Sequence, residues 1–386
     1  MAAIDLPRPP FMDSEELRML EDVMDRFCAE HFTPEKSARY RDQGYVDREV
    51  WLAAGASGLL GTSVPEEYGG PGLDFRYDAL LMERLGVNDA LNFAQPLHNT
   101  VVVPYIIKYG SEEQKQKFLP GTITGETICA VAMTEPGAGS DLQGMRTSAV
   151  RDGDHYVING QKTFISNGHH ANLIIVAAKT DPAAGSKGIS LFLVETDKTP
   201  GFERGKLLHK LGQEARDTAE LFFTDMRVPA ENLLGGEGKG FAMLMTELPK
   251  ERLVIGWQAI GMIESAINKT IAYTRDRKMF GKTLFDMQNT QFKLAECKTK
   301  ATIGKSFLYN CTELLLEKKL DAATASMAKL WISEAQGEVV DECLQLHGGY
   351  GYILEYPIAE MYKDARGFRI YGGASEVMKL LIARSL

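Results

Sequence analysis

Residues 130–142 read Ala130-Val-Ala-Met-Thr-Glu-Pro-Gly-Ala-Gly-Ser-Asp-Leu142 and separate two kinds of sequence pattern. The chain before this stretch has helical periodicity, and the next hundred residues have the short apolar runs and turn pairs of strands. Gly137 and Gly139 let the backbone approach a flat or phosphorylated ligand and offer it N–H donors. Composition alone supports a tight turn between domains equally well.

The part of the chain before residue 127 is predicted to be helical. Apolar residues recur every three or four positions in residues 17–27, 47–56 and 75–85. Residues 90–109 are apolar nearly all round, as expected of a buried helix, but Pro96 should break or kink that helix.

The central part carries a strand pattern. Short β-branched and aromatic runs occupy residues 156–158, 163–165, 173–177, 189–194 and 219–223, with the turn pairs Asp152-Gly153, Asn159-Gly160 and Asn167-Gly168 near them. Several short strands at this spacing predict a small antiparallel barrel or sandwich.

The last part returns to helical periodicity. A long periodic segment covers residues 241–276, in which we expect Pro249 to bend the helix or start a new one, and further helices are expected at 284–318, 322–346 and 375–384. The fold class is therefore α+β. We expect an N-terminal helical domain (residues 1–126), a central antiparallel β-barrel or sandwich (127–236) and a C-terminal four-helix bundle (237–386).

Charge and cysteine content narrow the function classes. A formal net charge of −9 disfavours nucleic acid and anionic membranes as partners. The five cysteines lack zinc spacing, so we expect no metal site and reduced, mostly buried thiols. Without a membrane-length apolar run or a signal-peptide pattern, we expect no membrane insertion. The expected compartment is the cytoplasm if the source is bacterial, with the mitochondrial matrix possible if it is eukaryotic.

Two motifs resemble the signatures of the acyl-CoA dehydrogenase family of flavoenzymes. Met133-Thr-Glu-Pro-Gly-Ala-Gly-Ser-Asp141 is similar to the first signature, and Gln345-Leu-His-Gly-Gly-Tyr-Gly-Tyr352 followed by Glu355-Tyr-Pro-Ile358 to the start of the second. The resemblance covers essentially the whole chain and keeps the order helical, β, helical. It implies FAD between the β domain and the C-terminal bundle, and a homotetramer that is a dimer of dimers. It also implies an acyl-CoA substrate and electron-transferring flavoprotein as electron acceptor.

The resemblance assigns the cofactor-binding residues by position. The flavin edge and ring would be lined by Met133, Thr134, Gly139, Ser140, Phe164, Ile165 and Ser166. A neighbouring subunit would reach the FAD with residues that match Arg277, Phe280 and Gln288. The pyrophosphate and adenosine would lie near Gln345, Leu346, His347, Gly348, Gly349, Ala374, Ser375 and Glu376. Arg277 suits a diphosphate through its planar guanidinium, although a solvated surface charge explains it too.

The catalytic base is predicted to be Glu251. Most family members have a Tyr-Glu-Gly-Thr motif near the C-terminus, whereas the matching residues here are Tyr371-Gly-Gly-Ala374. The long-chain and isovaleryl-type subfamilies have glycine there and take the base from a Glu-Arg-Leu motif, which is present as Glu251-Arg-Leu253. Without the resemblance, Glu251 reads as an ordinary first-turn acid stabilised by the helix dipole. Glu135 is expected to bond local backbone instead.

The resemblance also predicts a substrate. The acyl-CoA would contact Ser140, Ala242, Pro249, Lys250, Arg252, Tyr371, Gly372 and Gly373. Small Ala242 and the break at Pro96 suggest a deep slot for a long-chain or methyl-branched acyl group, for example a terpenoid-like citronellyl chain. A short branched isovaleryl-type substrate is the alternative.

Two rival functions exist within the same fold. Oxygen-using acyl-CoA oxidases are usually longer, with an extra helical domain for which 386 residues leave no room. A non-catalytic, DNA-associated flavoprotein homologue would need a basic surface, and the net charge of −9 argues against one.

Overall fold

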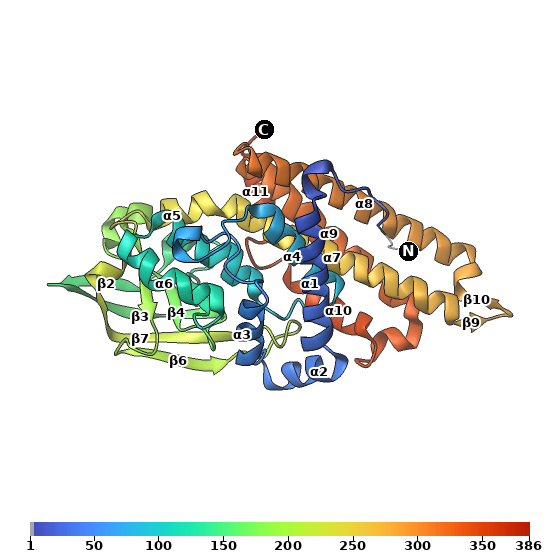
Figure 1. Cartoon of the computed structure of the whole chain (residues 1–386), viewed down its shortest axis with the longest axis horizontal. Helices are drawn as coiled ribbons and strands as arrows, with labels where there is room; N and C mark the ends of the chain where they lie inside the picture. Colours follow the sequence, from blue (N-terminus) through green and yellow to red (C-terminus); the bar gives the residue numbers. More distant parts are fainter. Residues whose placement is uncertain (1–3) are drawn as a thin grey trace.

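The computed structural model describes residues 4–386, and Figure 1 shows a sheet at one end of the long axis and helices along the rest. The first helices are α1 (Glu15–His31), α2 (Pro34–Gln43), α3 (Arg48–Ala56), α4 (Phe75–Val87), α5 (Val103–Tyr109) and α6 (Glu112–Thr124). A π-helical turn, Leu97–Val102, leads into α5. Pro96 therefore precedes this turn and lies near the start of a helix, where its missing N–H costs little.

The strands are β1 (Cys129–Ala132), β2 (Ser148–Asp152), β3 (His155–Ser166), β4 (Leu173–Lys179), β5 (Ile189–Glu195), β6 (Phe202–Leu207), β7 (Thr218–Pro229) and β8 (Leu233–Leu234). Within residues 4–386 these form one sheet in the order β6-β7-β3-β2-β4-β5-β8, with β1 paired to β4. Its inner side chains form a core between the strands, as the apolar runs predicted.

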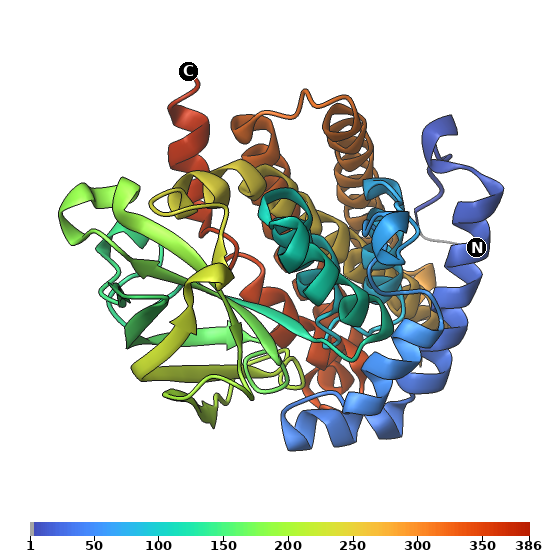
Figure 2. The same cartoon turned by 60° about the vertical axis from the view of Figure 1, so that its left-hand side comes forward.

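Two details of the predicted β domain are wrong. The sheet is not purely antiparallel, because β1 and β2 both pair with β4 in parallel. It also does not close into a barrel, since the path through the described strands ends at β6 and β8. Between β1 and β4 the chain passes through β2 and β3 and returns alongside β1 in the same direction. Figure 2 shows the green sheet on one side of the molecule, beside the helices.

Asn159-Gly160 is not a turn, as the sequence suggested, but a bulge inside the continuous strand β3. A Cβ on Gly160 would lie 2.4 Å from Oγ1 of Thr147 on the preceding segment. Glycine is therefore needed here because the Thr147 segment packs closely against β3. An Asn-Gly pair is compatible with a bulge as well as with a turn.

The C-terminal part contains α7 (Gly240–Asp276), α8 (Gln288–Leu316), α9 (Ala322–His347), α10 (Pro357–Gly367) and α11 (Ser375–Ala383). A short hairpin of β9 (Lys278–Met279) and β10 (Lys282–Thr283) joins α7 to α8. Pro249 neither ends α7 nor starts a new helix, contrary to one of the two expectations. Met245, whose carbonyl loses its partner at Pro249, is exposed, so water can satisfy it.

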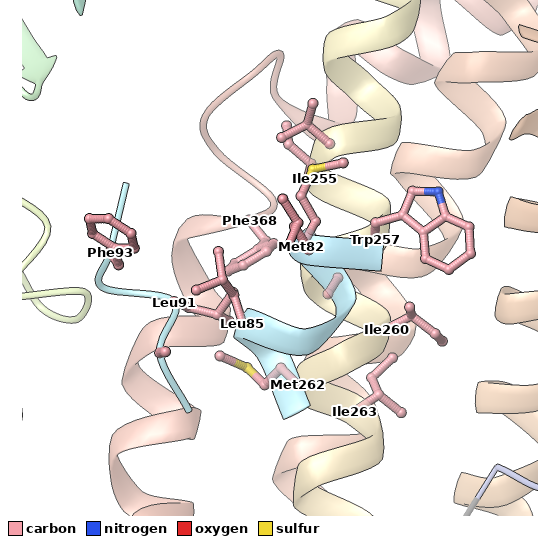
Figure 3. Close-up of a cluster of buried hydrophobic side chains, with 14 of the residues drawn as sticks. Met82, Leu85, Leu91, Phe93, Ile255, Trp257, Ile260, Met262, Ile263 and Phe368 are labelled. Carbon is pink, nitrogen blue, oxygen red and sulfur yellow. The ribbon is translucent and has the colours of Figure 1, made fainter. Parts of the chain in front are cut away.

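The N-terminal and C-terminal helices meet where α4 crosses α7. A Cβ on Gly86 of α4 would lie 2.6 Å from the Met262 nitrogen, and a Cβ on Gly261 of α7 would lie 2.2 Å from the Glu83 carbonyl oxygen. The two backbones therefore touch without side chains between them. Figure 3 shows the apolar side chains of both helices packed around this crossing.

The described chain has two further features that bear on its environment. All five cysteines are free and buried, as predicted. None of the helices within residues 4–386 combines the length and hydropathy that a membrane crossing needs.

We predict that Gly261→Ala lowers the free energy of unfolding by about 2–3 kcal/mol, because the new methyl group would overlap a backbone carbonyl that cannot move alone. Gly337→Ala on α9 is the matched control, since its nearest neighbour would be the Arg369 guanidinium at 3.4 Å, and alanine favours a helix. Denaturant unfolding of both variants measures this difference. Equal stabilities would show that the α4–α7 contact is not a constraint.

Candidate active site

Glu251 of α7 and Tyr105 of α5 form the centre of the candidate site. The Tyr105 hydroxyl donates to Oε1 of Glu251 at 2.9 Å, and the Tyr105 ring is buried. Burial raises the pKa of Glu251 to about 7, although the Tyr105 hydrogen bond and the Lys250 charge act in the opposite direction. A carboxyl with this pKa can exchange a proton near neutral pH.

Glu247, one helical turn earlier on α7, has the opposite character. It is buried, but it accepts hydrogen bonds from Lys108 Nζ at 2.7 Å and Tyr109 Oη at 2.8 Å, and Lys250 Nζ lies 3.6 Å away. Burial alone would raise the pKa of Glu247, yet the Lys108 hydrogen bond and the Lys250 charge outweigh it and lower the pKa. Glu247 therefore stays ionised near neutral pH, whereas Glu251 has a pKa suited to exchanging a proton there.

The loop around Gly372 lies against the same face of α7. A Cβ on Gly372 would come within 2.2 Å of Cδ1 of Ile255, which is four residues after Glu251 and thus one turn along the same face. Gly372 also has a φ of +62°, a conformation that side chains disfavour. In Figure 3, Phe368, which precedes this loop, faces the α7 residues around Ile255. A side chain at position 372 would therefore have to displace the end of the Ile255 side chain and adopt a strained backbone conformation.

A buried lysine fixes this loop. Lys329 of α9 is fully buried, and its Nζ donates to the Gly373 carbonyl at 2.7 Å. Burial lowers the pKa of Lys329 to about 8. Tyr371 is held from the other side by Gln213, whose Nε2 donates to the Tyr371 hydroxyl at 3.1 Å. The backbone of the loop is therefore anchored on both sides of Gly372.

The remaining predicted substrate residues on α7 lie at different depths. Arg252 is buried, and its Nη1 donates to the Ala322 carbonyl at 3.2 Å. Pro249 and Lys250 are partly buried near Glu247 and Glu251. Ala242 is exposed at the start of α7 and is not among the residues gathered around Glu251 in the described chain.

The first signature lies on the surface next to strand β3. Gly139 and Ser140 are exposed, Met133 and Thr134 are partly buried, and a Cβ on Gly137 or Gly139 would have no atom within 4 Å. The Thr163 N–H donates to the Thr134 carbonyl at 2.9 Å, so this loop is tied to β3. The open space beside it leaves its backbone accessible to a flat ligand.

Phe164 stands out on β3, next to the signature loop. Its side chain is 68% exposed and its φ is +59°, at an irregularity in the pairing of β3 with β7. A strained, exposed aromatic residue is costly unless it serves a contact. Ile165 points into the β core, so this segment offers a ligand the Phe164 ring, the partly buried Ser166 and the backbone.

Glu135 is structural, in agreement with the prediction from the sequence. Its carboxylate accepts the backbone N–H groups of Arg146 at 2.6 Å and Thr147 at 3.0 Å. The buried Lys162 ammonium donates to it at 2.8 Å. Burial would raise the pKa of Glu135, but the charge and hydrogen bond of Lys162 lower it. Because three donors already occupy the Glu135 carboxylate and its pKa is lowered, Glu135 is not a candidate base.

The second group of predicted cofactor residues lies at the other end of the molecule. Arg277, Phe280 and Gln288 are exposed at the β9–β10 hairpin and the start of α8, opposite the sheet in Figure 1. Arg277 lies over the Tyr350 ring, next to the segment Gln345, Leu346, His347, Gly348 and Gly349. A single chain therefore does not bring this group to the signature loop.

Within this second group, most backbone is exposed. Gln345, Gly348 and Gly349 are exposed, and a Cβ on either glycine would have no atom within 4 Å. Leu346 is partly buried. His347 is buried, stacked on Tyr273, with Nδ1 2.8 Å from the Cys343 carbonyl, so its ring serves its own helix.

The last predicted cofactor residues follow the Gly372 loop. Ala374 is partly buried, and Glu376 is exposed in the first turn of α11. Ser375 is buried, and its hydroxyl donates to Oε1 of Glu334 at 2.5 Å. Ser375 thus anchors the loop, and Glu376 remains available at the surface.

Tyr105, Lys329 and Ile255 were not identified from the sequence. Tyr105 and Tyr109 are four residues apart in a helix whose other residues, apart from Lys108, are apolar, and buried hydroxyls need partners. The four-residue spacing of the two tyrosines could have predicted two hydrogen-bond acceptors one turn apart on a neighbouring helix. Lys329 and Ile255 carry no comparable signal, because their contacts come from residues more than forty positions away.

Comparison with known proteins gives a consistent result over the whole chain. Residues 14–126, 130–226 and 238–386 match the profiles described as acyl-CoA dehydrogenase N-terminal, middle and C-terminal domains. The chain is 48% identical over 375 residues to the mitochondrial long-chain specific acyl-CoA dehydrogenase of Mus musculus, covering 97% of this chain and 87% of the relative. It is 37% identical over 376 residues to the mitochondrial isovaleryl-CoA dehydrogenase of Pongo abelii, covering 96% and 89%.

A solved structure agrees. The crystal structure of an acyl-CoA dehydrogenase from Geobacillus kaustophilus superposes with a TM-score of 0.94 at 46% identity, covering 97% of this chain and 98% of that one.

We predict that Gly372→Ala destabilises the protein more than Gly72→Ala does. Both glycines have a φ of +62°, but a Cβ at position 72 would meet nothing within 4 Å. Gly72→Ala thus measures the backbone strain alone, about 1–2 kcal/mol. Adding Ile255→Val removes Cδ1 and should recover about 1 kcal/mol in a double-mutant cycle measured by denaturant unfolding. Equal losses for the two alanine variants would mean that the Ile255 contact is unimportant.

Proposed function

Because the chain belongs to the acyl-CoA dehydrogenase family, we propose that it desaturates the Cα–Cβ bond of an acyl-CoA thioester to a trans-2-enoyl-CoA with Glu251 as base. The chain is a flavin oxidoreductase of this family, and FAD is its cofactor. The observation that carries the proposal is the carboxyl of Glu251, with a pKa of about 7, on the helix face against which the Gly372 loop packs.

Glu251 performs the proton transfer in this proposal. Its Oε1 is held by Tyr105, so Oε2 is free to take the proton from Cα of the thioester. The negative charge that develops on the thioester oxygen is stabilised by the N–H of Gly372, in a loop that Lys329 anchors through Gly373. The low polarity that raises the pKa of Glu251 also strengthens this interaction.

The residues present fit FAD. The open backbone at Gly137 and Gly139 suits a flat ring edge, and the exposed Phe164 supplies an aromatic face. We propose that Met133, Thr134, Gly139, Ser140 and the Phe164–Ser166 segment hold the isoalloxazine. When bound, FAD accepts the hydride from Cβ of the substrate.

The exposed group at the hairpin supports a shared cofactor site. Arg277, Phe280 and Gln288 lie at the opposite end from the signature loop, so we propose that they complete the FAD site of a neighbouring subunit. Gln345–Gly349 and Ala374–Glu376 would contact the pyrophosphate and adenosine. A homotetramer built as a dimer of dimers supplies such a neighbour, and electron-transferring flavoprotein is the proposed electron acceptor.

The proposed acyl group is long or methyl-branched. The 48% identity to a long-chain specific relative and the glycine at position 372 support this choice. Pro96 lies just before the helical segment that leads to Tyr105. The exposed position of Ala242 does not add support, so the citronellyl type of chain rests on the family pattern alone.

Glu251→Gln is predicted to abolish proton abstraction, lowering the rate of flavin bleaching by acyl-CoA about 100- to 10,000-fold under anaerobic conditions. The amide keeps the shape and can still accept from Tyr105, so flavin content and fold should be retained. Glu247→Gln is the matched control, one turn away on α7, and should stay within about tenfold of the wild type. Bleaching of Glu251→Gln at the wild-type rate would exclude Glu251 as the base.

A panel of acyl-CoAs tests the substrate. We expect kcat/KM to be higher for dodecanoyl-CoA and methyl-branched long chains than for butyryl-CoA and isovaleryl-CoA, because longer apolar chains gain more burial. A preference for isovaleryl-CoA would favour the short branched-chain alternative. A preference for butyryl-CoA would contradict both.

A further inference from the structure

We propose that Tyr105 is a positioning residue, whose hydroxyl holds Oε1 of Glu251 so that Oε2 receives the substrate proton. This inference rests on the proposed role of Glu251 as base. The hydrogen bond is 2.9 Å long and joins α5 to α7 through two residues that are 146 positions apart in the sequence.

Burial makes this contact specific. Tyr105 is 1% exposed, so its hydroxyl cannot exchange the carboxylate for bulk water without loss. Within residues 4–386, this hydroxyl donates to the Glu251 carboxylate. The Tyr105 hydroxyl fixes the rotation of the Glu251 carboxylate. A base that is already held in one orientation loses less entropy in the reaction.

The two helices are in register over one full turn. Tyr105 and Tyr109 are four residues apart on α5, and their hydroxyls reach Glu251 and Glu247, which are four residues apart on α7. The π-helical turn Leu97–Val102 directly precedes α5. Figure 1 shows α5 beside the yellow start of α7.

The chemistry of the partners separates the two carboxylates. Glu247 receives an ammonium from Lys108 as well as a phenol, and its pKa is lowered despite burial. Glu251 receives a neutral phenol, which orients the carboxylate without neutralising its charge. A lysine in place of Tyr105 would favour the ionised form more strongly and make a poorer base.

The groups that face Glu251 come from both helices. Tyr105 lies on α5, while Lys250, Glu247 and Arg252 lie on α7. Burial raises the pKa of Glu251 most, Tyr105 and then Lys250 lower it, Glu247 raises it, and Arg252 lowers it. Among these groups, Tyr105 is the one whose hydrogen bond can be removed without changing the charge of the site.

The test is the pH profile of kcat/KM for Tyr105→Phe. The base must be ionised, so the wild-type rate should fall as the pH drops below about 7. Without the donor, the ionised form is less stabilised, the pKa of Glu251 rises, and this acidic limb should move up by about one pH unit. We expect kcat to fall several-fold with little change in KM.

Tyr109→Phe is the matched control, because it removes the same hydroxyl one turn away and leaves Lys108 on Glu247. Its acidic limb should coincide with that of the wild type. A Tyr105→Phe limb that also coincides, in a variant with wild-type melting temperature and flavin content, would overturn the proposal.

A second variant covers the case in which phenylalanine disturbs the fold. 3-Fluorotyrosine at position 105 keeps the hydroxyl, is a stronger donor, and should move the acidic limb to lower pH. An unchanged limb in this protein would also count against the proposal.

An infrared titration provides a readout that needs no turnover. The carboxyl stretching band that disappears in Glu251→Gln should titrate at higher pH in Tyr105→Phe than in the wild type. This separates the two hypotheses, because wild-type bleaching by Glu251→Gln removes the base assignment, whereas an unshifted band in Tyr105→Phe removes only the role of Tyr105.

Discussion

The backbone contact between α4 and α7 at Gly86 and Gly261 is the constraint on which the helical part of the molecule depends. Two helices approach this closely only where neither has a Cβ at the crossing, because any side chain would overlap a carbonyl or an amide of the other helix. The contact joins the N-terminal helices to the C-terminal ones. It leaves another face of α7 for α5 and the Gly372 loop.

Helix α7 therefore does more than fill the core. Over two turns it presents Glu247 to an ammonium, Glu251 to a phenol, and Ile255 to the loop around Gly372. The same helix thus supplies an ionised carboxylate and a carboxyl that titrates near neutrality. Their difference comes from the partners on α5 and from burial, since both residues are glutamates on one helix.

Two backbone conformations with positive φ occur at residues of the predicted site. Phe164 has a positive φ and an exposed ring, and Gly372 has a positive φ against Ile255. The positive φ is costly at Phe164, and the Thr163–Thr134 hydrogen bond helps to hold that segment in place. At Gly372 it costs little because glycine has no Cβ, and Lys329 fixes the neighbouring Gly373 carbonyl.

The sequence by itself determined the order helical, β, helical, most helix positions and the family, because periodicity and the two signatures are local. It misread Asn159-Gly160 and could not show the parallel pairing of β1 with β4, since a bulge and a turn use the same residues and strand direction depends on distant partners. It also named Glu251 as a candidate, through the resemblance. Only the tertiary structure decided that Glu251 lies against Tyr105 and near Ile255 and Gly372, because burial and hydrogen-bond partners are set by chain segments that meet far apart in the sequence.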